Sequence, residues 1–397
     1  MSSTKSQYKQ IVKATSLFGG VQVFTIIVLI VKSKFVALYI GPIGVGIVGL
    51  YTTTIALVTS VTNFGLKTSS VKNISEAYAT GDAIKVATII GVLRKLVWFT
   101  GLLGTIVMLL SAHWLSEYTF GNSNNTVAFY WLSITLLLNQ LSSGQIALLE
   151  GTRHLKLLAK ASFFGSLIGI SITLPIYYIW RIDGIIPVFI ITSSVTLMLT
   201  YWFSSNIKIE KILILPKTIA IEGKQMLIMG FLIGLTGILD NVIAYVTRLF
   251  IVNLGDLKMV GLFTAGFAIV NIYVGMIFSA MLVDYYPRLS AVSKDNDSCK
   301  SIINQQAEII VLILAPLVIF FLVFIKIIIL ILYSEEFLSI NTMIYWAMLG
   351  VLFKAINWSV GIIVLAKGAS KLYFIIYIFA FIVALSTNIC GYYYYGL

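Results

Sequence analysis

Residues 307–332 read AEIIVLILAPLVIFFLVFIKIIILIL and carry only two charged side chains, Glu308 and Lys326. An apolar run of this length exceeds the roughly 20 residues that a helix needs to cross the hydrocarbon of a bilayer. Because lipid offers the backbone no hydrogen-bond partner, such a segment must form a helix. The membrane therefore decides the fold of this part of the chain.

Runs of the same kind recur along the chain and predict eleven membrane helices. The predicted spans are roughly residues 14–31, 43–66, 86–112, 127–149, 161–180, 184–204, 226–252, 259–285, 307–332, 342–365 and 372–395. The composition agrees, since 59% of the 397 residues are hydrophobic and only 11% are charged. A soluble domain carries about 25% charged residues, so we predict an all-α polytopic membrane protein and exclude a soluble globular one.

The 27 Lys and Arg residues are distributed unevenly between the loops. With the N-terminus in the cytoplasm, 20 of them lie on the cytoplasmic side and 5 outside, while Arg248 and Lys354 fall within spans. This assignment places Lys32 and Lys34 in the first outside loop. Such a bias sets the orientation of membrane proteins. We therefore predict a multi-pass membrane protein with a cytoplasmic N-terminus, whose net charge of +12 reflects topology rather than nucleic-acid binding.

Short matches at a nearly constant offset indicate an internal repeat. Val48-Gly49-Leu50-Tyr51 matches Val260-Gly261-Leu262-Phe263, which lies 212 residues later, and Gly184 corresponds to Gly396 at the same offset. Halves of six spans share an orientation, so the repeat predicts two pseudo-symmetric lobes with a cavity between them. The second lobe lacks its last helix. The predicted lobes are residues 1–205, with spans one to six, and residues 206–397, with spans seven to eleven.

Ionisable and amide side chains inside the spans are the candidate functional residues. A charge at the centre of the membrane costs about 2.5 to 3.5 kcal/mol on insertion scales and normally faces a cavity or a partner. The residues predicted to bind an anionic group of the substrate, such as a pyrophosphate, are Arg248, Lys354 and Arg94. The residues predicted to carry coupling or to line the cavity are Asp240, Asn241, Asp284, Glu150 and Asn63. The alternatives are interhelical ion pairs and, near span ends, anchoring at the membrane interface.

No set of residues in the sequence predicts catalysis or a metal site. The two histidines, His113 and His154, fall at opposite membrane faces, and the two cysteines lack a CxxC spacing. Gly44, Gly46 and Gly49 fit the GxGxxG pattern, but they lack the strand and βαβ unit of a dinucleotide site. Close helix packing or a tight turn is the better interpretation. We expect no cofactor beyond a coupling proton or sodium ion.

Four motifs lie at corresponding turns and helix ends of a known family. They are GPIGVGIVGLY at residues 41–51, Asn63-Phe64-Gly65-Leu66, Gly81-Asp82, and Tyr286-Pro287-Arg288-Leu289-Ser290. Across nearly its whole length the chain resembles the O-antigen flippases, or Wzx-type translocases, of the multidrug/oligosaccharidyl-lipid/polysaccharide exporter superfamily.

That resemblance implies two MATE-like lobes and alternating access. It also implies a place in the bacterial inner (cytoplasmic) membrane and transfer of undecaprenyl-pyrophosphate-linked oligosaccharide from its cytoplasmic to its periplasmic leaflet. The expected partners are this lipid-linked substrate, membrane lipids and the polysaccharide polymerase machinery.

Two other classes of function were weighed against the flippase. A cation-coupled multidrug exporter on the same fold favours an acidic cavity, and the bases within the spans weigh against it. A membrane enzyme such as a polymerase or glycosyltransferase would place its chemistry on a large loop outside the membrane. The longest outer loop, about 15 residues around His113 to Thr126, carries only one acid, Glu117. We therefore expect a transporter and not an enzyme.

Overall fold

The computed structural model describes residues 2–207, 209–210, 212 and 215–397, and within them the chain is almost entirely helical. The α-helices are α1 (Ser2–Thr62), α2 (Leu66–Ala79), α3 (Ala83–Phe120), α4 (Thr126–Gly151), α5 (Leu155–Trp180), α6 (Ile185–Ser205), α7 (Pro216–Leu254), α8 (Leu257–Ile269), α9 (Gly275–Ala291), α10 (Asn296–Leu332), α11 (Asn341–Ala366) and α12 (Ser370–Tyr395). Short 3-10 or π turns are η1 (Ser123–Asn125), η2 (Arg181–Gly184), η3 (Val270–Val274) and η4 (Glu335–Ile340). The predicted all-α class is confirmed.

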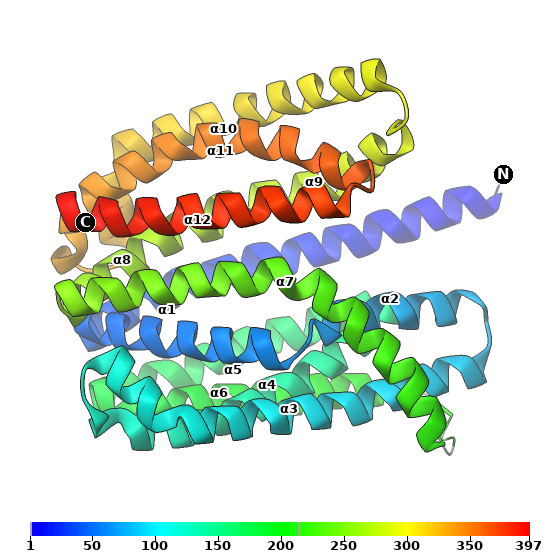
Figure 1. Ribbon diagram of the computed structural model, residues 1–397, viewed down its shortest axis with the longest axis horizontal. Helices are drawn as coiled ribbons and strands as arrows, with labels where there is room; N and C mark the ends of the chain where they lie inside the picture. Colours follow the sequence, from blue (N-terminus) through cyan, green and yellow to red (C-terminus); the bar gives the residue numbers. More distant parts are fainter. Residues whose placement is uncertain (1, 208, 211, 213–214) are drawn as a thin grey trace. The chain divides into compact units, whose positions relative to one another are not determined.

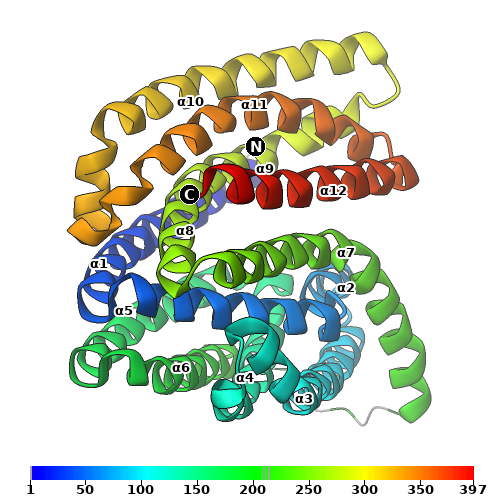
Figure 2. The ribbon, with the colours of Figure 1, turned by 60° about the vertical axis from the view of Figure 1, so that its left-hand side comes forward.

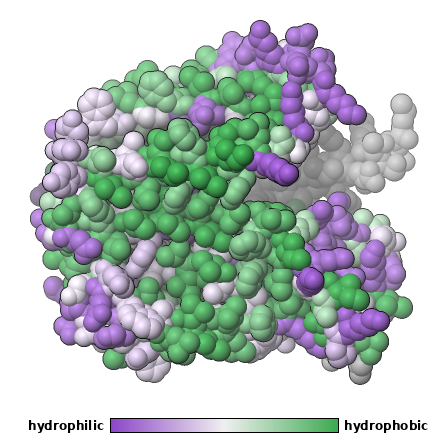
Figure 3. Space-filling model, in the orientation of Figure 1, coloured by the Kyte–Doolittle hydropathy of each residue, from purple (hydrophilic) through white to green (hydrophobic). Residues whose placement is uncertain are grey.

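Eight helical stretches among the described residues are long and apolar enough to cross a membrane. Two of them are interrupted, Phe24–Thr62 at Gly41 and Leu155–Ser205 by η2, so each provides two helices. The segment α8–η3–α9 covers the predicted eighth span, which completes the eleven predicted helices. Hydrophobic side chains cover the middle of the helices, and hydrophilic ones gather near the helix ends (Figure 3).

Gly41 divides α1 into two arms. Its φ of 63° and ψ of −174° lie outside the helical region, in a conformation that glycine adopts at little cost. The following Pro42 also disfavours a helical residue before it. Nothing between Lys32 and Gly41 breaks the helix, because this stretch has neither glycine nor proline. The prediction that Lys32 and Lys34 lie in an outside loop is therefore wrong, since both lie in the first arm of α1.

The described residues pack into two units. The first unit consists of Met1–Tyr39 with Leu50–Tyr245, and the second consists of Ile40–Gly49 with Val246–Leu397. In the first unit, α4 packs against α2, α3 and α6, and α5 packs against α6 (Figure 1, Figure 2). In the second unit, α11 packs against α9, α10 and α12. The two lobes divided at residue 205 rest on the sequence repeat and stay a prediction.

Helix lengths recur in the same order in the two units. In the first unit α3, α4 and α5 have 38, 26 and 26 residues. In the second unit α10, α11 and α12 have 37, 26 and 26 residues. A 3-10 turn leads into the middle helix of each set, η1 before α4 and η4 before α11. No counterpart of α6 follows α12 among the described residues.

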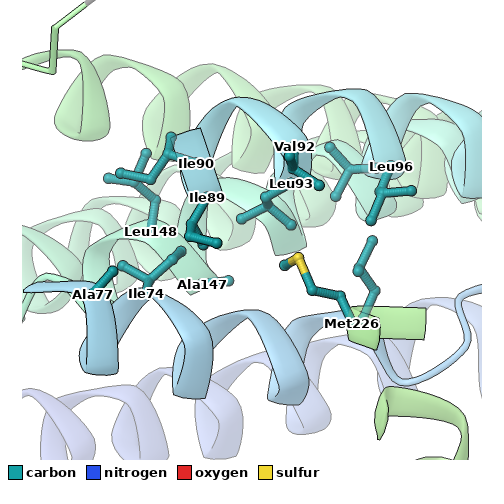
Figure 4. Close-up of a cluster of buried hydrophobic side chains, with 12 residues drawn as sticks. Ile74, Ala77, Ile89, Ile90, Val92, Leu93, Leu96, Ala147, Leu148 and Met226 are labelled. Carbon is teal, nitrogen blue, oxygen red and sulfur yellow. The ribbon is translucent and has the colours of Figure 1, made fainter. Parts of the chain in front are cut away.

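An apolar cluster joins α2, α3, α4 and α7 in the first unit. Ile74 of α2, Leu93 of α3 and Leu148 of α4 are almost completely buried in it, and Met226 of α7 points into the same cluster (Figure 4). The helix α2 lies outside the predicted spans, yet it buries one face here, including Ile74 and Ala77. The cluster therefore fixes the turn between α1 and α2 beside α7.

Glycines permit a close approach at that turn. Phe64 and Gly65 have φ values of 50° and 58°, so the chain reverses between α1 and α2 within the left-handed region. A Cβ atom on Gly65 would collide with the carbonyl oxygen of Gly230 on α7, and a Cβ on Gly230 would collide with that of Phe64. This contact sets the position of α7 against the end of α1.

Candidate functional site

A pocket of about 430 Å³ that contains several amide and hydroxyl side chains lies within the first unit. The second arm of α1 provides Thr52, Ile55, Ala56, Thr59, Ser60 and Asn63. These residues recur every three or four positions, so they share one face of the helix. The remaining lining residues are Asn139 of α4, Phe189 of α6 and Asn241 of α7. We call this cavity the amide pocket, after its three asparagines.

The polar groups of the amide pocket are neutral amides and hydroxyls. Asn63 Oδ1 accepts a hydrogen bond of 2.9 Å from the backbone N–H of Gly65, which orients its amide group. The Ser60 hydroxyl donates to the Leu57 carbonyl at 2.8 Å. The Thr59 hydroxyl is buried and has no hydrogen-bond partner among the described residues. Amides both donate and accept, so the pocket suits a ligand that is itself rich in hydroxyl groups.

The structure brings together two residues that the sequence singled out separately, Asn63 and Asn241. Sequence reasoning missed Asn139, although a signal was present in an asparagine that directly follows three leucines in a membrane span. Asp240 precedes Asn241 on α7, and its side chain is exposed. The coupling role of Asp240 stays a prediction.

Arg248 lies on α7 in the second unit and contacts two residues of α8. Its Nε donates a hydrogen bond of 3.1 Å to Thr264 Oγ1. Its guanidinium carbon lies 5.5 Å from the ring centroid of Phe263. A cation over an aromatic ring gains about 0.5 to 2 kcal/mol, depending on how far it is desolvated. The Arg248 side chain is thus held in place by the protein itself.

The other predicted cations are exposed. Lys354 of α11 lies with its Nζ 5.7 Å from the ring centroid of Phe278, within the second unit. Arg94 lies on α3 in the first unit, about 16 Å along the helix from Ala83 at a rise of about 1.5 Å per residue. The roles predicted for these cations in binding substrate stay predictions.

Two of the predicted acids form ion pairs. Glu150 of α4 lies 3.1 Å from Lys67 of α2, and the two side chains are 29% and 44% exposed. Asp284 lies 2.9 Å from Arg288, one turn further along α9. The sequence left ion pairing open as the alternative to a functional role. In the structure both acids make such a pair.

The GxGxxG pattern lies in a tight helix crossing. A Cβ atom on Gly46 would collide with the carbonyl oxygen of Leu257, and a Cβ on Gly261 would collide with that of Pro42. These residues all belong to the second unit. The glycines therefore allow α8 to approach the start of the second arm of α1, which is the packing interpretation of the motif.

Lys32 is the membrane cation that sequence reasoning misplaced. The predicted span was ended at residue 31, so the charge was assigned to a loop. In the structure the helix continues, and the Lys32 side chain lines a pocket of its own in the first unit. An unbroken helical stretch from 32 to 40 was the signal that could have found it.

Residues 35–342 match the family model described as polysaccharide biosynthesis protein. The chain belongs to this family. No curated protein matches it. As a member of the polysaccharide biosynthesis protein family, the chain is a multi-pass membrane protein, with the helices described above.

Solved structures share the fold of this family member. An inward-facing multidrug resistance MATE-family transporter of the MOP superfamily has a TM-score of 0.71 and 15% identity, covering 89% of this chain and 84% of that chain. A MOP-superfamily transporter from Pyrococcus furiosus, described as having a binding pocket of reverse polarity, has a TM-score of 0.66 and 15% identity, covering 97% and 89%. A MATE transporter in complex with MaL6 has a TM-score of 0.63 and 14% identity, covering 97% and 90%. At these identities the likeness establishes the fold, which is that of MOP-superfamily transporters.

Proposed function

We propose that this protein is a flippase for lipid-linked oligosaccharides. It moves undecaprenyl-pyrophosphate-linked O-antigen units from the cytoplasmic to the periplasmic leaflet of the bacterial inner membrane by alternating access. Family membership supports the link to polysaccharide biosynthesis, and the fold supports transport across a membrane. The distribution of Lys and Arg supports a cytoplasmic N-terminus.

The amide pocket is the observation that carries the proposal. A sugar unit crossing about 30 Å of hydrocarbon loses the water that satisfies its hydroxyl groups, and each unsatisfied polar group costs several kcal/mol there. Asn63, Asn139 and Asn241, together with nearby hydroxyls, offer donors and acceptors to replace that water. Phe189 adds an aromatic face against which the apolar side of a sugar ring can pack.

Charged residues within the spans are proposed to bind the pyrophosphate and to couple transport to an ion. The guanidinium of Arg248 and the ammonium of Lys354 provide positive charge for the pyrophosphate of the substrate. Asp240 carries the coupling proton or sodium ion. None of these residues lines the amide pocket, so sugar recognition and charge recognition use different parts of the protein.

A cation-coupled multidrug exporter on the same fold is the second candidate, since transporters of that kind share the fold. A cationic drug requires negative charge in its binding cavity. The residues that line the amide pocket include no acid, which favours the flippase. Unchanged drug resistance on overexpression is the expected result.

Deletion of the gene tests the proposal, in cells that have no second flippase for the same polymer. Lipid-linked repeat units should accumulate on the cytoplasmic side, and the Asn241→Leu variant should restore surface polymer about tenfold less well than wild type. That magnitude corresponds to about 1 to 3 kcal/mol for a buried polar group left unpaired. Asn253→Leu, at an exposed position near the end of the same helix, is the matched control. Normal surface polymer in the deletion strain would overturn the proposal.

A further inference from the structure

Lys32 lines a second pocket of the first unit, also of about 430 Å³, between the first arm of α1 and the helices α5 and α6. Pockets that bind small ligands have volumes of about 300 to 1,000 Å³. The hydroxyl residues that line this pocket are Thr25, Ser162, Ser166, Thr192, Thr196 and Thr200. Lys32 is the one charged residue in the lining. We call this cavity the lysine pocket.

Helical spacing points the hydroxyls of each helix toward the lysine pocket. Thr192, Thr196 and Thr200 lie four residues apart on α6, and Ser162 and Ser166 have the same spacing on α5. Side chains four residues apart occupy one face of a helix. The threonine ladder therefore extends about 12 Å along α6, at about 1.5 Å per residue. This polar stripe lies inside a membrane helix, where a purely apolar face is the default.

The pocket lies deep within its helices. Lys32 precedes the Gly41 turn by nine residues, which corresponds to about 13 Å of helix. Thr196 lies near the middle of α6, and Gly169 lies near the middle of α5. With a hydrocarbon core of about 30 Å, these positions fall close to the centre of the membrane. Simple snorkelling of Lys32 to a nearby interface is therefore a poor explanation for its presence.

Small residues in membrane helices commonly serve close helix packing, but the lysine pocket lacks such packing. A Cβ atom added to Gly169 would meet nothing within 4 Å. A Cβ added to Gly165 would meet only Leu199, at 3.9 Å. The glycines and hydroxyls here line open space rather than a helix contact.

The charge of Lys32 has no protein counter-ion among the described side chains. The ion pairs of this part of the chain involve other residues. A charge at such depth is costly, and an anion in the pocket offsets that cost. The hydroxyls of Thr192, Thr196 and Thr200 donate to backbone carbonyls at 2.6 to 2.8 Å, which leaves their oxygens free to accept. The pocket therefore offers a cation beside a row of acceptors.

We propose that the lysine pocket binds the phosphate head group of an anionic membrane lipid. The phosphate oxygens lie at the ammonium group of Lys32. The hydroxyl groups of the sugar or glycerol that is esterified to the phosphate donate to the threonine ladder of α6. Two sources share this chemistry, a polyprenyl diphosphate carrying a sugar and a phospholipid with a hydroxylated head group such as phosphatidylglycerol. The proposal concerns a different cavity from the amide pocket and does not depend on flipping.

Lipid binding to the full-length protein in detergent, measured by native mass spectrometry and by thermal stabilisation, tests this proposal. The probes are undecaprenyl diphosphate carrying one sugar, phosphatidylglycerol and the uncharged lipid diacylglycerol. Wild type should bind at least one phosphate lipid, and Lys32→Gln should weaken that binding about tenfold or more, as expected for loss of a charge-assisted hydrogen bond. Lys34→Gln, two residues along the same helix, should bind like wild type. If the polyprenyl diphosphate is the only phosphate lipid that binds, the pocket is assigned to a polyprenyl substrate. If phosphatidylglycerol binds, the pocket is assigned to bulk lipid.

A second pair of variants keeps the test valid if Lys32→Gln fails to fold. Gly169→Leu leaves Lys32 in place and fills open space with a side chain, so it should also weaken phosphate-lipid binding about tenfold. Gly169→Ala adds a single methyl group where nothing lies within 4 Å and should bind like wild type. Equal binding of phosphate lipids by wild type, Lys32→Gln and Gly169→Leu would overturn the proposal. Equal binding of charged and uncharged lipids by wild type would overturn it as well.

Discussion

Lys32 in the first unit and Arg248 in the second unit are both cations in membrane helices, but their surroundings differ. In the first unit Lys32 lines a pocket together with six residues that carry hydroxyl groups. In the second unit Arg248 is bound by the Thr264 hydroxyl and lies over the Phe263 ring. A charge in a membrane helix is therefore a weak guide to a ligand site by itself. The space and the partners around the charge decide how far it also stabilises the fold.

The largest effect is expected at the turn between α1 and α2 in the first unit. Gly65→Ala should destabilise the protein by about 3 kcal/mol, because a positive φ and a collision with the Gly230 carbonyl add together. Thermal unfolding in detergent measures the change. Gly237→Ala on α7 is the control, since a Cβ there meets nothing within 4 Å and alanine favours the helix. Equal melting temperatures for the two variants would mean that the turn does not hold α7.

The second prediction compares the two cations directly. Arg248→Gln should lower the free energy of unfolding by about 1 to 2 kcal/mol, because it removes a cation over a ring and a hydrogen bond. Lys32→Gln should leave stability unchanged or raise it by up to about 2 kcal/mol, because a costly charge within the membrane is removed. Thermal unfolding of the two variants at the same lipid content shows whether each substitution lowers or raises stability. Loss of stability to the same extent in both variants would contradict the distinction between a cation that lines a pocket and one that is paired within the protein.

Hydrophobic runs predicted the helices well because lipid leaves the backbone no alternative. Each predicted span, including 307–332 within α10, lies in a helical part of the structure, but the runs did not predict the helix ends. The first apolar run predicts a span that ends at a charge, whereas the first arm of α1 continues to Gly41. Lys32 was therefore missed as a residue inside a membrane helix. Charge is a poor marker of helix ends, because a lysine is a good helix former.

The candidate site was predicted only in part. Asn63 and Asn241 were chosen as polar residues inside spans, and the fold brings them to one pocket. Asn139 was missed because one amide in an apolar run has several structural explanations. Glu150 and Asp284 were chosen by the same rule, yet each lies beside a base. Sequence alone does not say which helix faces meet. That information is needed to tell a polar residue that lines a pocket from one that forms an ion pair.

A smaller effect is expected for Glu150→Gln in the first unit. The pair with Lys67 is partly exposed, so its loss should cost less than about 1 kcal/mol after solvent screening. Lys67→Gln should cost the same, and the double variant should cost no more than either one. Transport by Glu150→Gln should stay at the wild-type level. Abolished transport with unchanged stability would instead assign Glu150 a coupling role.

The smallest effect is expected in the second unit, at the start of α10. The Ser298 hydroxyl and the backbone N–H of Asp297 donate to Asp295, which lowers the pKa of its carboxyl below the ordinary value. A lowered pKa in the folded state gives stability that is present above the unfolded pKa, about 3.9. This stability is lost as the pH falls through the folded value. Asp295→Asn keeps a capping group and should remove this part of the acid dependence of the melting temperature. An identical acid dependence in wild type and variant contradicts the assignment.

Transfer of a lipid-linked oligosaccharide by purified protein in liposomes tests the central claim most directly. An undecaprenyl-pyrophosphate-linked oligosaccharide is placed in both leaflets, and a sugar-modifying enzyme is added outside. With wild type, nearly all of the lipid should become accessible to the enzyme, whereas Asn241→Leu should slow the approach to that limit about tenfold. Accessibility that stays at the half of the lipid already facing outward, in liposomes that contain folded wild-type protein, would contradict the account.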